Sequence, residues 1–197
     1  MDYSIQHQTN MDMKVDVVSD TEIKGYKLTE YWAFDQQISF YAKFSKPFTY
    51  QIVRDTLTDQ NGKMQPRCKV LLSFKTKKDE QVMVKMGISA VDTEGAKKNL
   101  DAEIPAWDFE KVRSDARQAW NDYLSKIDVS TSSDTDRTIF YTAMYHTAIS
   151  PNLFTDVDGR YWGMDRKVHQ GNADRPVYTV FSLWDAFRAL HPLLSII

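Results

Sequence analysis

The sequence predicts a β-rich segment followed by helices, and a change in the spacing of its apolar residues indicates this order. From Lys14 to Val91 the apolar residues recur at short, strand-like intervals that are separated by turn signals. From Trp107 to Ile127 they recur every three or four residues, which is typical of an amphipathic helix. With 197 residues and 42% hydrophobic content, the chain can form a substantial core.

The β-rich segment is expected to form about six antiparallel strands, which is typical of a sandwich. They are expected at Met13–Val17, Tyr31–Phe34, Ile38–Phe44, Tyr50–Val53, Lys69–Phe74 and Gln81–Ile88. Asn61-Gly62 and the polar run Lys75–Glu80 are typical of hairpin connections. Because these strands do not divide evenly into two closed sheets, we expect a partial sandwich whose opening strands lie upstream.

Helices are expected in the second half of the chain. Pro105 is compatible with the start of the first helix, and a polar linker follows it at Val129–Ser133. The second helix is expected from Asp134, a possible N-cap, to Ile149, with Pro151 closing it. Its predicted apolar face consists of Ile139, Phe140, Ala143, Met144 and Thr147.

The remainder is expected to be irregular and then helical. Residues Asn152–Val177 are predicted to form a long excursion with a short hairpin around Tyr161 and Val168. A third helix is expected from about Ser182, kinked or restarted by Pro192. Since the chain stops inside this apolar run, at Ile197, we expect it to be an incomplete piece of a longer protein.

Composition excludes several classes of function. The 25 Lys and Arg against 27 Asp and Glu leave no basic stripe for a phosphate backbone, so nucleic acid is not expected as a partner. No run of about eighteen apolar residues is present, so no membrane span is predicted. The N-terminal sequence has no signal-peptide pattern. Cys68 cannot form an intrachain disulfide and is expected to be a buried, inert thiol.

Common catalytic and metal motifs are absent from the sequence. Asp156-Val157-Asp158-Gly159 resembles the start of a calcium loop, but Lys167 stands where the loop needs its Glu, so a tight surface turn is expected. The four histidines show no i, i+4 pair that would place a zinc site on one helix. No serine-hydrolase elbow, Walker loop or dinucleotide fingerprint occurs.

The segment from Tyr178 to Leu194 brings Trp184, Asp185 and Arg188 into the first turns of one helix. One interpretation is structural: a core tryptophan, an aspartate favoured by the helix dipole, and a surface ion pair between Asp185 and Arg188. The other is a sugar site, in which the indole stacks on C–H groups and the charged pair binds hydroxyls. The residues themselves leave both interpretations open, and the structural one is the commoner.

This segment resembles the signature of glycoside hydrolase family 92, calcium-dependent exo-acting α-mannosidases with a similar F-S-L-W-D-x-F-R-x-x-H-P-L-L string. Further ordered matches extend the resemblance from about Gly25 onward. They are Phe44–Phe48, Gly87–Ser89, Glu94–Ala96, Asn99-Leu100, Glu103–Pro105, Trp107–Phe109, Ala119–Asn121, Phe140–Ala143, Tyr145–Thr147, Ser150–Asn152 and Asp156–Tyr161.

The resemblance implies a partial antiparallel β-sandwich, then a linker helix, then the beginning of an (α/α)6 barrel. We therefore expect a partial sandwich domain at residues 1–104, the linker helix at 105–130 and the start of the catalytic domain at 131–197. The resemblance favours the sugar-site interpretation for Trp184 and Asp185, and less strongly for Arg188. For His146 and Asp158 a structural role is as well supported as a functional one.

The resemblance also implies what the parent protein does. It would remove terminal α-linked mannose from glycans by inverting hydrolysis, with calcium as cofactor, in the periplasm or outside the cell. The family's general acid, general base and most calcium ligands lie downstream of the signature, so this chain is expected to contain no catalytic residue and no metal ligand, and to be inactive alone. The alternatives are a non-catalytic carbohydrate-binding or interaction module, or an inactive remnant.

Overall fold

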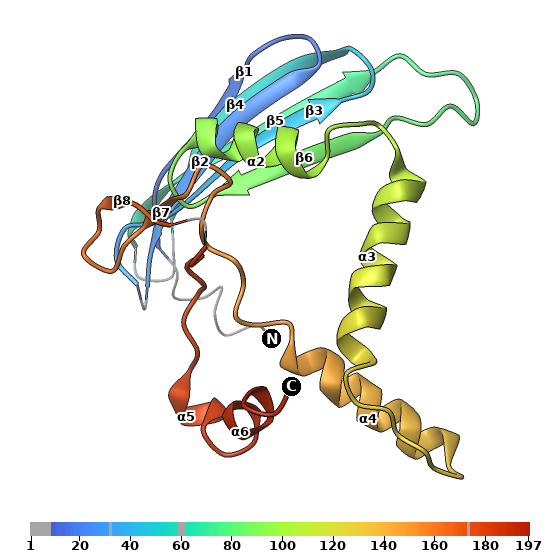
Figure 1. Cartoon of the computed structure of the whole chain (residues 1–197). Coiled ribbons are helices and arrows are strands. Elements are labelled where there is room, and N and C mark those ends of the chain that lie inside the picture. The colour runs from blue at the N-terminus through green and yellow to red at the C-terminus, as the bar shows by residue number, and fades with distance from the viewer. Residues whose placement is uncertain (1–8, 32, 59–61, 173) are drawn as a thin grey trace. The chain divides into compact units, whose positions relative to one another are not determined.

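The computed structural model describes residues 9–31, 33–58, 62–172 and 174–197. Its first part contains six antiparallel strands in two sheets (Figure 1). The strands are β1 (Thr9–Val17), β2 (Glu22–Glu30), β3 (Gln36–Phe44), β4 (Phe48–Thr58), β5 (Met64–Phe74) and β6 (Val84–Ser89). One sheet has the order β1-β2-β3-β6, and the other pairs β4 with β5.

The core between the sheets is small and rich in phenylalanine. Ile23, Ala42 and Phe48 are buried there, and half-buried apolar side chains from β1, β3 and β5 pack around them. The rings of Phe44 and Phe48 meet edge to face with their centroids 5.3 Å apart. Strand-like patterning therefore predicted the correct fold class, an antiparallel sandwich arrangement.

Three details of the strand prediction are wrong. Of the expected strand Tyr31–Phe34, Trp32 lies outside the described residues, and Tyr31, Ala33 and Phe34 are not in a strand, because the chain turns here and Asp35 has a positive φ of 53°. The second strand is instead β2, which the sequence analysis did not identify. Lys75–Glu80 is not a hairpin connection, since β5 and β6 belong to different sheets. Of the expected Asn61-Gly62 turn, Asn61 lies outside the described residues, and Gly62 has a φ of 78°.

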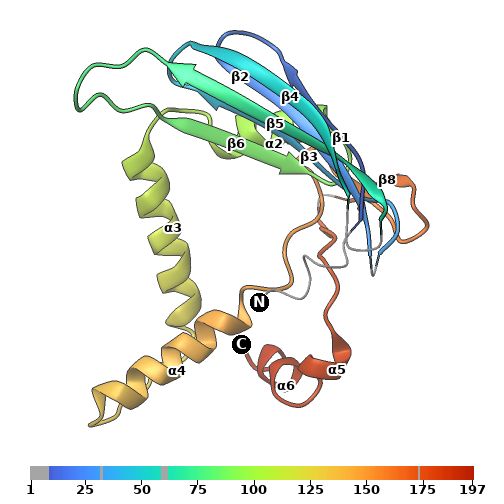
Figure 2. The ribbon, with the colours of Figure 1, turned by 180° about the vertical axis from the view of Figure 1, so that it is seen from behind.

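Helix α2 (Thr93–Glu103), which was not predicted, packs on the outer face of the larger sheet. It buries Ala96 and Leu100 against Tyr41 of β3. Gly87 of β6 allows this close approach, because a Cβ there would lie 2.2 Å from the Ala96 carbonyl oxygen. Figures 1 and 2 show α2 and the β4–β5 pair on opposite sides of the larger sheet.

Two longer helices follow. They are α3 (Phe109–Leu124) and α4 (Asp134–Thr147), close to the predicted ranges. The N-cap of α4 is Ser133 and not Asp134, since the Ser133 hydroxyl accepts a hydrogen bond from the Asp136 N–H. Only part of the predicted apolar face of α4 is covered: Met144 is buried, whereas Ile139 is exposed.

The excursion after α4 contains the predicted hairpin, formed by β7 (Arg160–Trp162) and β8 (Val168–Gln170). Two short helices, α5 (Leu183–Ala186) and α6 (Leu190–Leu194), then correspond to the predicted helix interrupted by Pro192. The chain forms two compact units. The first, the strand unit, comprises Met1–Trp107 and Phe154–Pro176, and the second, the helical unit, comprises Asp108–Leu153 and Val177–Ile197. The expected domain boundaries stay a prediction. None of the helices within the described ranges is long and apolar enough to cross a membrane.

Candidate functional site

The predicted sugar-contact residues lie on α5 and in the turn that follows it, within the helical unit. Hydrogen bonds between Asn152, in the segment after α4, and Thr179 anchor the residues that lead into α5. The Thr179 N–H donates to the Asn152 carbonyl oxygen at 2.9 Å, and the Asn152 N–H donates to the Thr179 hydroxyl at 2.8 Å. This double contact fixes the chain three residues before the cap of α5, Ser182.

Trp184 presents its side chain to the solvent. It is 88% exposed, so the alternative of a core tryptophan does not hold in this structure. An exposed indole offers a flat apolar face of the kind that stacks on the C–H face of a sugar ring. The structure therefore leaves Trp184 available for a ligand, which is a necessary condition for the predicted role.

Asp185 and Arg188 do not form the expected surface ion pair. The Ser182 hydroxyl donates to an Asp185 carboxylate oxygen at 2.6 Å, whereas the Arg188 guanidinium lies 5.7 Å from the centre of the Phe187 ring. No ion pair joins these two side chains, both of which belong to the described residues. The Ser182 contact restricts the Asp185 rotamer and leaves the other carboxylate oxygen free to accept hydroxyl hydrogen bonds.

His191 is an unpredicted feature of the same segment. Its ring packs edge to face against Phe181 with centroids 4.9 Å apart, and its Nε2 is buried with no hydrogen-bond partner among the described residues. A buried imidazole nitrogen without a partner is unfavourable. The spacing of the histidines tests only for a metal site along one helix and does not predict that this nitrogen is buried.

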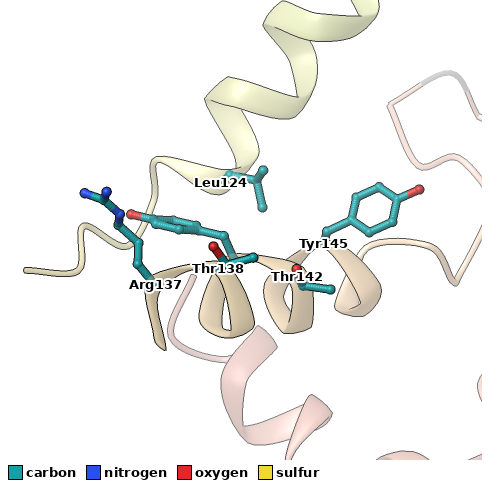
Figure 3. A pocket seen from close by; sticks show the side chains of 6 residues that line it. Leu124, Arg137, Thr138, Thr142 and Tyr145 are labelled. Atoms are coloured by element: carbon teal, nitrogen blue, oxygen red, sulfur yellow. The ribbon is translucent and has the colours of Figure 1, made fainter. Parts of the chain in front are cut away.

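A hollow between α3 and α4 does not coincide with these residues (Figure 3). Its volume is about 510 Å³, and its lining combines Leu124 of α3 with Arg137, Thr138, Tyr141, Thr142 and Tyr145 of α4. The lining contains no carboxylate that could act as a general acid or base. His146, a weaker candidate, is exposed on α4 next to Tyr145 and does not line the hollow.

The Asp156 turn forms a polar cluster in the strand unit. Asp156 is only 5% exposed, so the expectation of a surface turn is wrong in this respect, although the turn itself forms with Gly159 at a φ of 84°. Its carboxylate accepts hydrogen bonds from the Ser89 hydroxyl at 2.7 Å and the Asn99 amide at 2.8 Å. The turn is thereby attached to both β6 and α2.

Arg160 supplies the positive charge of this cluster. Its guanidinium donates to Asp92 at 2.7 and 3.3 Å and to Asp158 at 2.9 Å, and Lys98 also bonds Asp158 at 2.9 Å. The hydrogen bond from Arg160 lowers the pKa of Asp92. Burial acts to raise the pKa of Asp158, but hydrogen bonds from Lys98 and Arg160 lower it overall.

These residues do not fit a calcium site. The carboxylates of Asp92 and Asp158 are already neutralised by Arg160 and Lys98, which occupy the position that a cation would need. Across the described residues, no group of three or more His, Cys, Asp and Glu side chains could hold a metal ion. Asp158 accordingly stabilises the fold in this structure.

Comparison with known proteins assigns matches to both halves of the chain. The model of the glycosyl hydrolase family 92 N-terminal domain matches residues 1–89, and that of the glycosyl hydrolase family 92 catalytic domain matches residues 95–197. An "Uncharacterized secreted glycosidase" from Arthroderma benhamiae is 35% identical over a region that covers 46% of this chain and 14% of that protein.

Solved structures with the same fold include two enzymes from Bacteroides thetaiotaomicron. The family GH92 α-mannosidase BT3965 is 34% identical, with a TM-score of 0.78, and has also been solved in complex with mannoimidazole. The family GH92 inverting mannosidase BT2199 is 23% identical, with a TM-score of 0.77, and supports the fold alone. This chain aligns over 95% of its own length with BT3965 but spans only 26% of that protein's chain.

Proposed function

The chain belongs to glycosyl hydrolase family 92, and from this premise we propose that it is part of a glycosidase that releases terminal α-linked mannose from glycans. The observation that carries the proposal is the 34% identity to the α-mannosidase BT3965 across nearly the whole chain. That enzyme has been solved with mannoimidazole, which supports a mannose-containing substrate here as well.

We assign Trp184 and Asp185 to the pocket that receives the terminal mannose. The exposed indole of Trp184 would stack on the sugar ring, and the free oxygen of Asp185 would accept a hydrogen bond from a sugar hydroxyl. Arg188 would donate to a further hydroxyl after leaving the Phe187 ring. These three side chains bind and orient the sugar and exchange no proton with the reacting bond.

Inverting hydrolysis needs two further carboxyl groups. One protonates the leaving oxygen and the other activates water on the opposite face of the ring, at a separation of roughly 6.5 to 9.5 Å. We place both groups outside residues 1–197, together with the ligands of the calcium ion implied by the family. The 197-residue chain alone would then bind sugar weakly and hydrolyse none.

The relative named as a secreted glycosidase supports an extracellular or periplasmic location for the whole protein. In that location terminal mannose on exported glycans would be accessible. Because positive and negative side chains nearly balance along the chain, we propose no nucleic-acid partner.

The test is hydrolysis of an aryl α-mannoside by the polypeptide as its native source makes it, beside the 197-residue chain. We expect activity from the longer polypeptide only, with β-mannose as the first product by NMR and loss of activity in Asp185→Asn. Binding of mannose without hydrolysis by the native polypeptide would instead establish the carbohydrate-binding module. A native polypeptide of 197 residues that neither binds nor hydrolyses mannosides would be an inactive remnant.

A further inference from the structure

The excursion Phe154–Pro176 belongs to the strand unit, although residues of the helical unit precede and follow it in the sequence. Leu153 and Val177, its neighbours along the chain, are both part of the helical unit. The excursion therefore leaves one unit, folds onto the other and returns. We call residues 154–176 the strap.

Buried hydrogen bonds and an ion pair hold the first part of the strap on the strand unit. Asp156 is 5% exposed and accepts from the Ser89 hydroxyl of β6 at 2.7 Å and from the Asn99 amide of α2 at 2.8 Å. Arg160 donates at 2.7 Å to Asp92, the N-cap residue of α2. Releasing the strap would leave the Ser89 hydroxyl and the Asn99 amide without their partner, which is unfavourable for buried groups.

The two ends of the strap meet in the helical unit. Asn152 and Thr179 are joined by the two hydrogen bonds described above, and Leu153 forms an antiparallel β-bridge with Tyr178. Ser182, the N-cap residue of α5, follows Thr179 after three residues, which span at most about 10 Å. A displacement of the strap would therefore reach the start of α5 through a short connection.

Helix α5 has few contacts of its own that could resist such a displacement. It consists of four residues, all of them described, and Ala186 alone among them is buried. Leu183 and Trp184 are exposed. A helix of this length is not stable by itself, so its orientation depends strongly on the segment that enters it.

We propose that Asp156 and Arg160 act as positioning residues for the mannose pocket. By holding the strap on β6 and α2, they fix the segment that presents Trp184 and Asp185 to the sugar. The inference rests on the proposed function, which assigns those two side chains to the pocket. A released strap would lower the fraction of molecules that is competent to bind. The apparent affinity falls with that fraction, whereas saturating substrate restores kcat.

The test measures KM and kcat for an aryl α-mannoside in the native polypeptide, at a temperature well below the Tm of every variant. In Arg160→Met we expect KM to rise roughly fivefold and kcat to stay within about twofold of wild type. Arg160→Lys keeps a cation that can bind Asp92 and should recover part of the loss. Asp156→Asn keeps the size of the side chain, loses the bond from the Asn99 amide and should also raise KM. Phe48→Leu is the matched control, because it weakens the core of the same unit away from the strap and should lower Tm but not change KM.

Amide hydrogen exchange of the same variants provides a readout that needs no activity. Arg160→Met should speed exchange at residues 177–187, and Phe48→Leu should not. Either a wild-type KM in active Arg160→Met or unchanged exchange at residues 177–187 would overturn the proposal. An equal rise of KM in Phe48→Leu would also overturn it, since loss of stability alone would then account for the effect. If the native polypeptide hydrolyses no mannoside but Arg160→Met still speeds exchange at these residues, the proposed function fails and the positioning by the strap stands.

Discussion

Asn99 and Asp156 form a buried hydrogen bond of 2.8 Å that joins helix α2 to the turn before β7, although 57 residues separate them in the sequence. The same Asn99 side chain accepts from the Val157 N–H at 2.8 Å and donates to the Ile88 carbonyl oxygen. It therefore holds strand, helix and turn together.

Replacing Asp156 should destabilise the strand unit strongly. Asp156→Ala removes both acceptor oxygens and leaves the Ser89 hydroxyl and the Asn99 amide buried without their partner. We expect a loss of about 2–4 kcal/mol in the free energy of unfolding, measured by urea titration. Asp165→Ala is the control, because that carboxylate is exposed and bonds His169 at the surface. Equal losses for both variants would contradict a special role for Asp156.

Gly95 should be intolerant of substitution, although it lies in the first turn of helix α2. Helix propensity alone predicts that alanine stabilises an interior glycine position by about 1 kcal/mol. In this structure a Cβ on Gly95 would lie 2.2 Å from Asp156 Oδ2 and 2.8 Å from the Ser89 hydroxyl oxygen. Gly95→Ala should therefore lower the urea midpoint, whereas Ser114→Ala on exposed α3 should leave it unchanged or raise it. A raised midpoint for Gly95→Ala would show that the Asp156 turn can move away.

The strand unit should lose stability in acid through Asp92 and Asp158. Their folded-state pKa values are lowered, so the stability they contribute is present above the unfolded-state pKa of about 3.9 and is lost as the pH falls through the folded values. Arg160→Met should lower stability at pH 7 and reduce the further loss between about pH 4 and pH 2.

The measurement is the urea midpoint across that pH range. Arg166→Met removes an exposed partner of Asp35 and serves as the control that should keep the wild-type pH dependence. An unchanged acid dependence in Arg160→Met would assign the effect to other carboxylates.

How much of this fold the sequence predicts depends on how strong the apolar pattern of each element is. The strands β3 to β6 carry strong apolar patterns and were found, with differences at their ends. β2 was missed because Glu22, Lys24 and Lys27 dilute its pattern. Helix α2 was missed because it buries small or polar residues, namely Gly95, Ala96 and Asn99 beside Leu100, which give little helical periodicity.

The candidate site was predictable only in part. The F-S-L-W-D string points to Trp184 and Asp185 as candidates, which stay a prediction, but neither the Ser182 contact nor the position of Arg188 over Phe187 follows from spacing. The Asp156 cluster was read as a surface turn because its partners Ser89 and Asn99 are distant in the sequence. Only the tertiary fold brings such polar groups together.

Replacing the imidazole of His191 by an apolar ring should not lower the thermal stability of the 197-residue chain. Its Nε2 is buried without a partner among the described residues, and its ring packs on Phe181. His191→Phe keeps an aromatic ring at this position and removes the unsatisfied nitrogen, so thermal stability should be unchanged or higher. If Tm falls in the native polypeptide but not in the 197-residue chain, a group from outside residues 1–197 bonds the imidazole there.

Replacing Trp184 should lower the mannosidase activity of the native polypeptide and leave the stability of the 197-residue chain nearly unchanged. Because its side chain is 88% exposed, Trp184→Ala should change the unfolding free energy of the 197-residue chain by no more than about 0.5 kcal/mol. Trp120→Ala is the matched control, because Trp120 packs on Tyr145 with ring centroids 4.5 Å apart, and its loss should cost about 2 kcal/mol. In the native polypeptide Trp184→Ala should reduce kcat/KM on an aryl α-mannoside by roughly tenfold or more, since a stacking face for the sugar is lost. A wild-type kcat/KM in that variant would remove Trp184 from the mannose pocket, and a large loss of stability in the 197-residue chain would return it to a structural role.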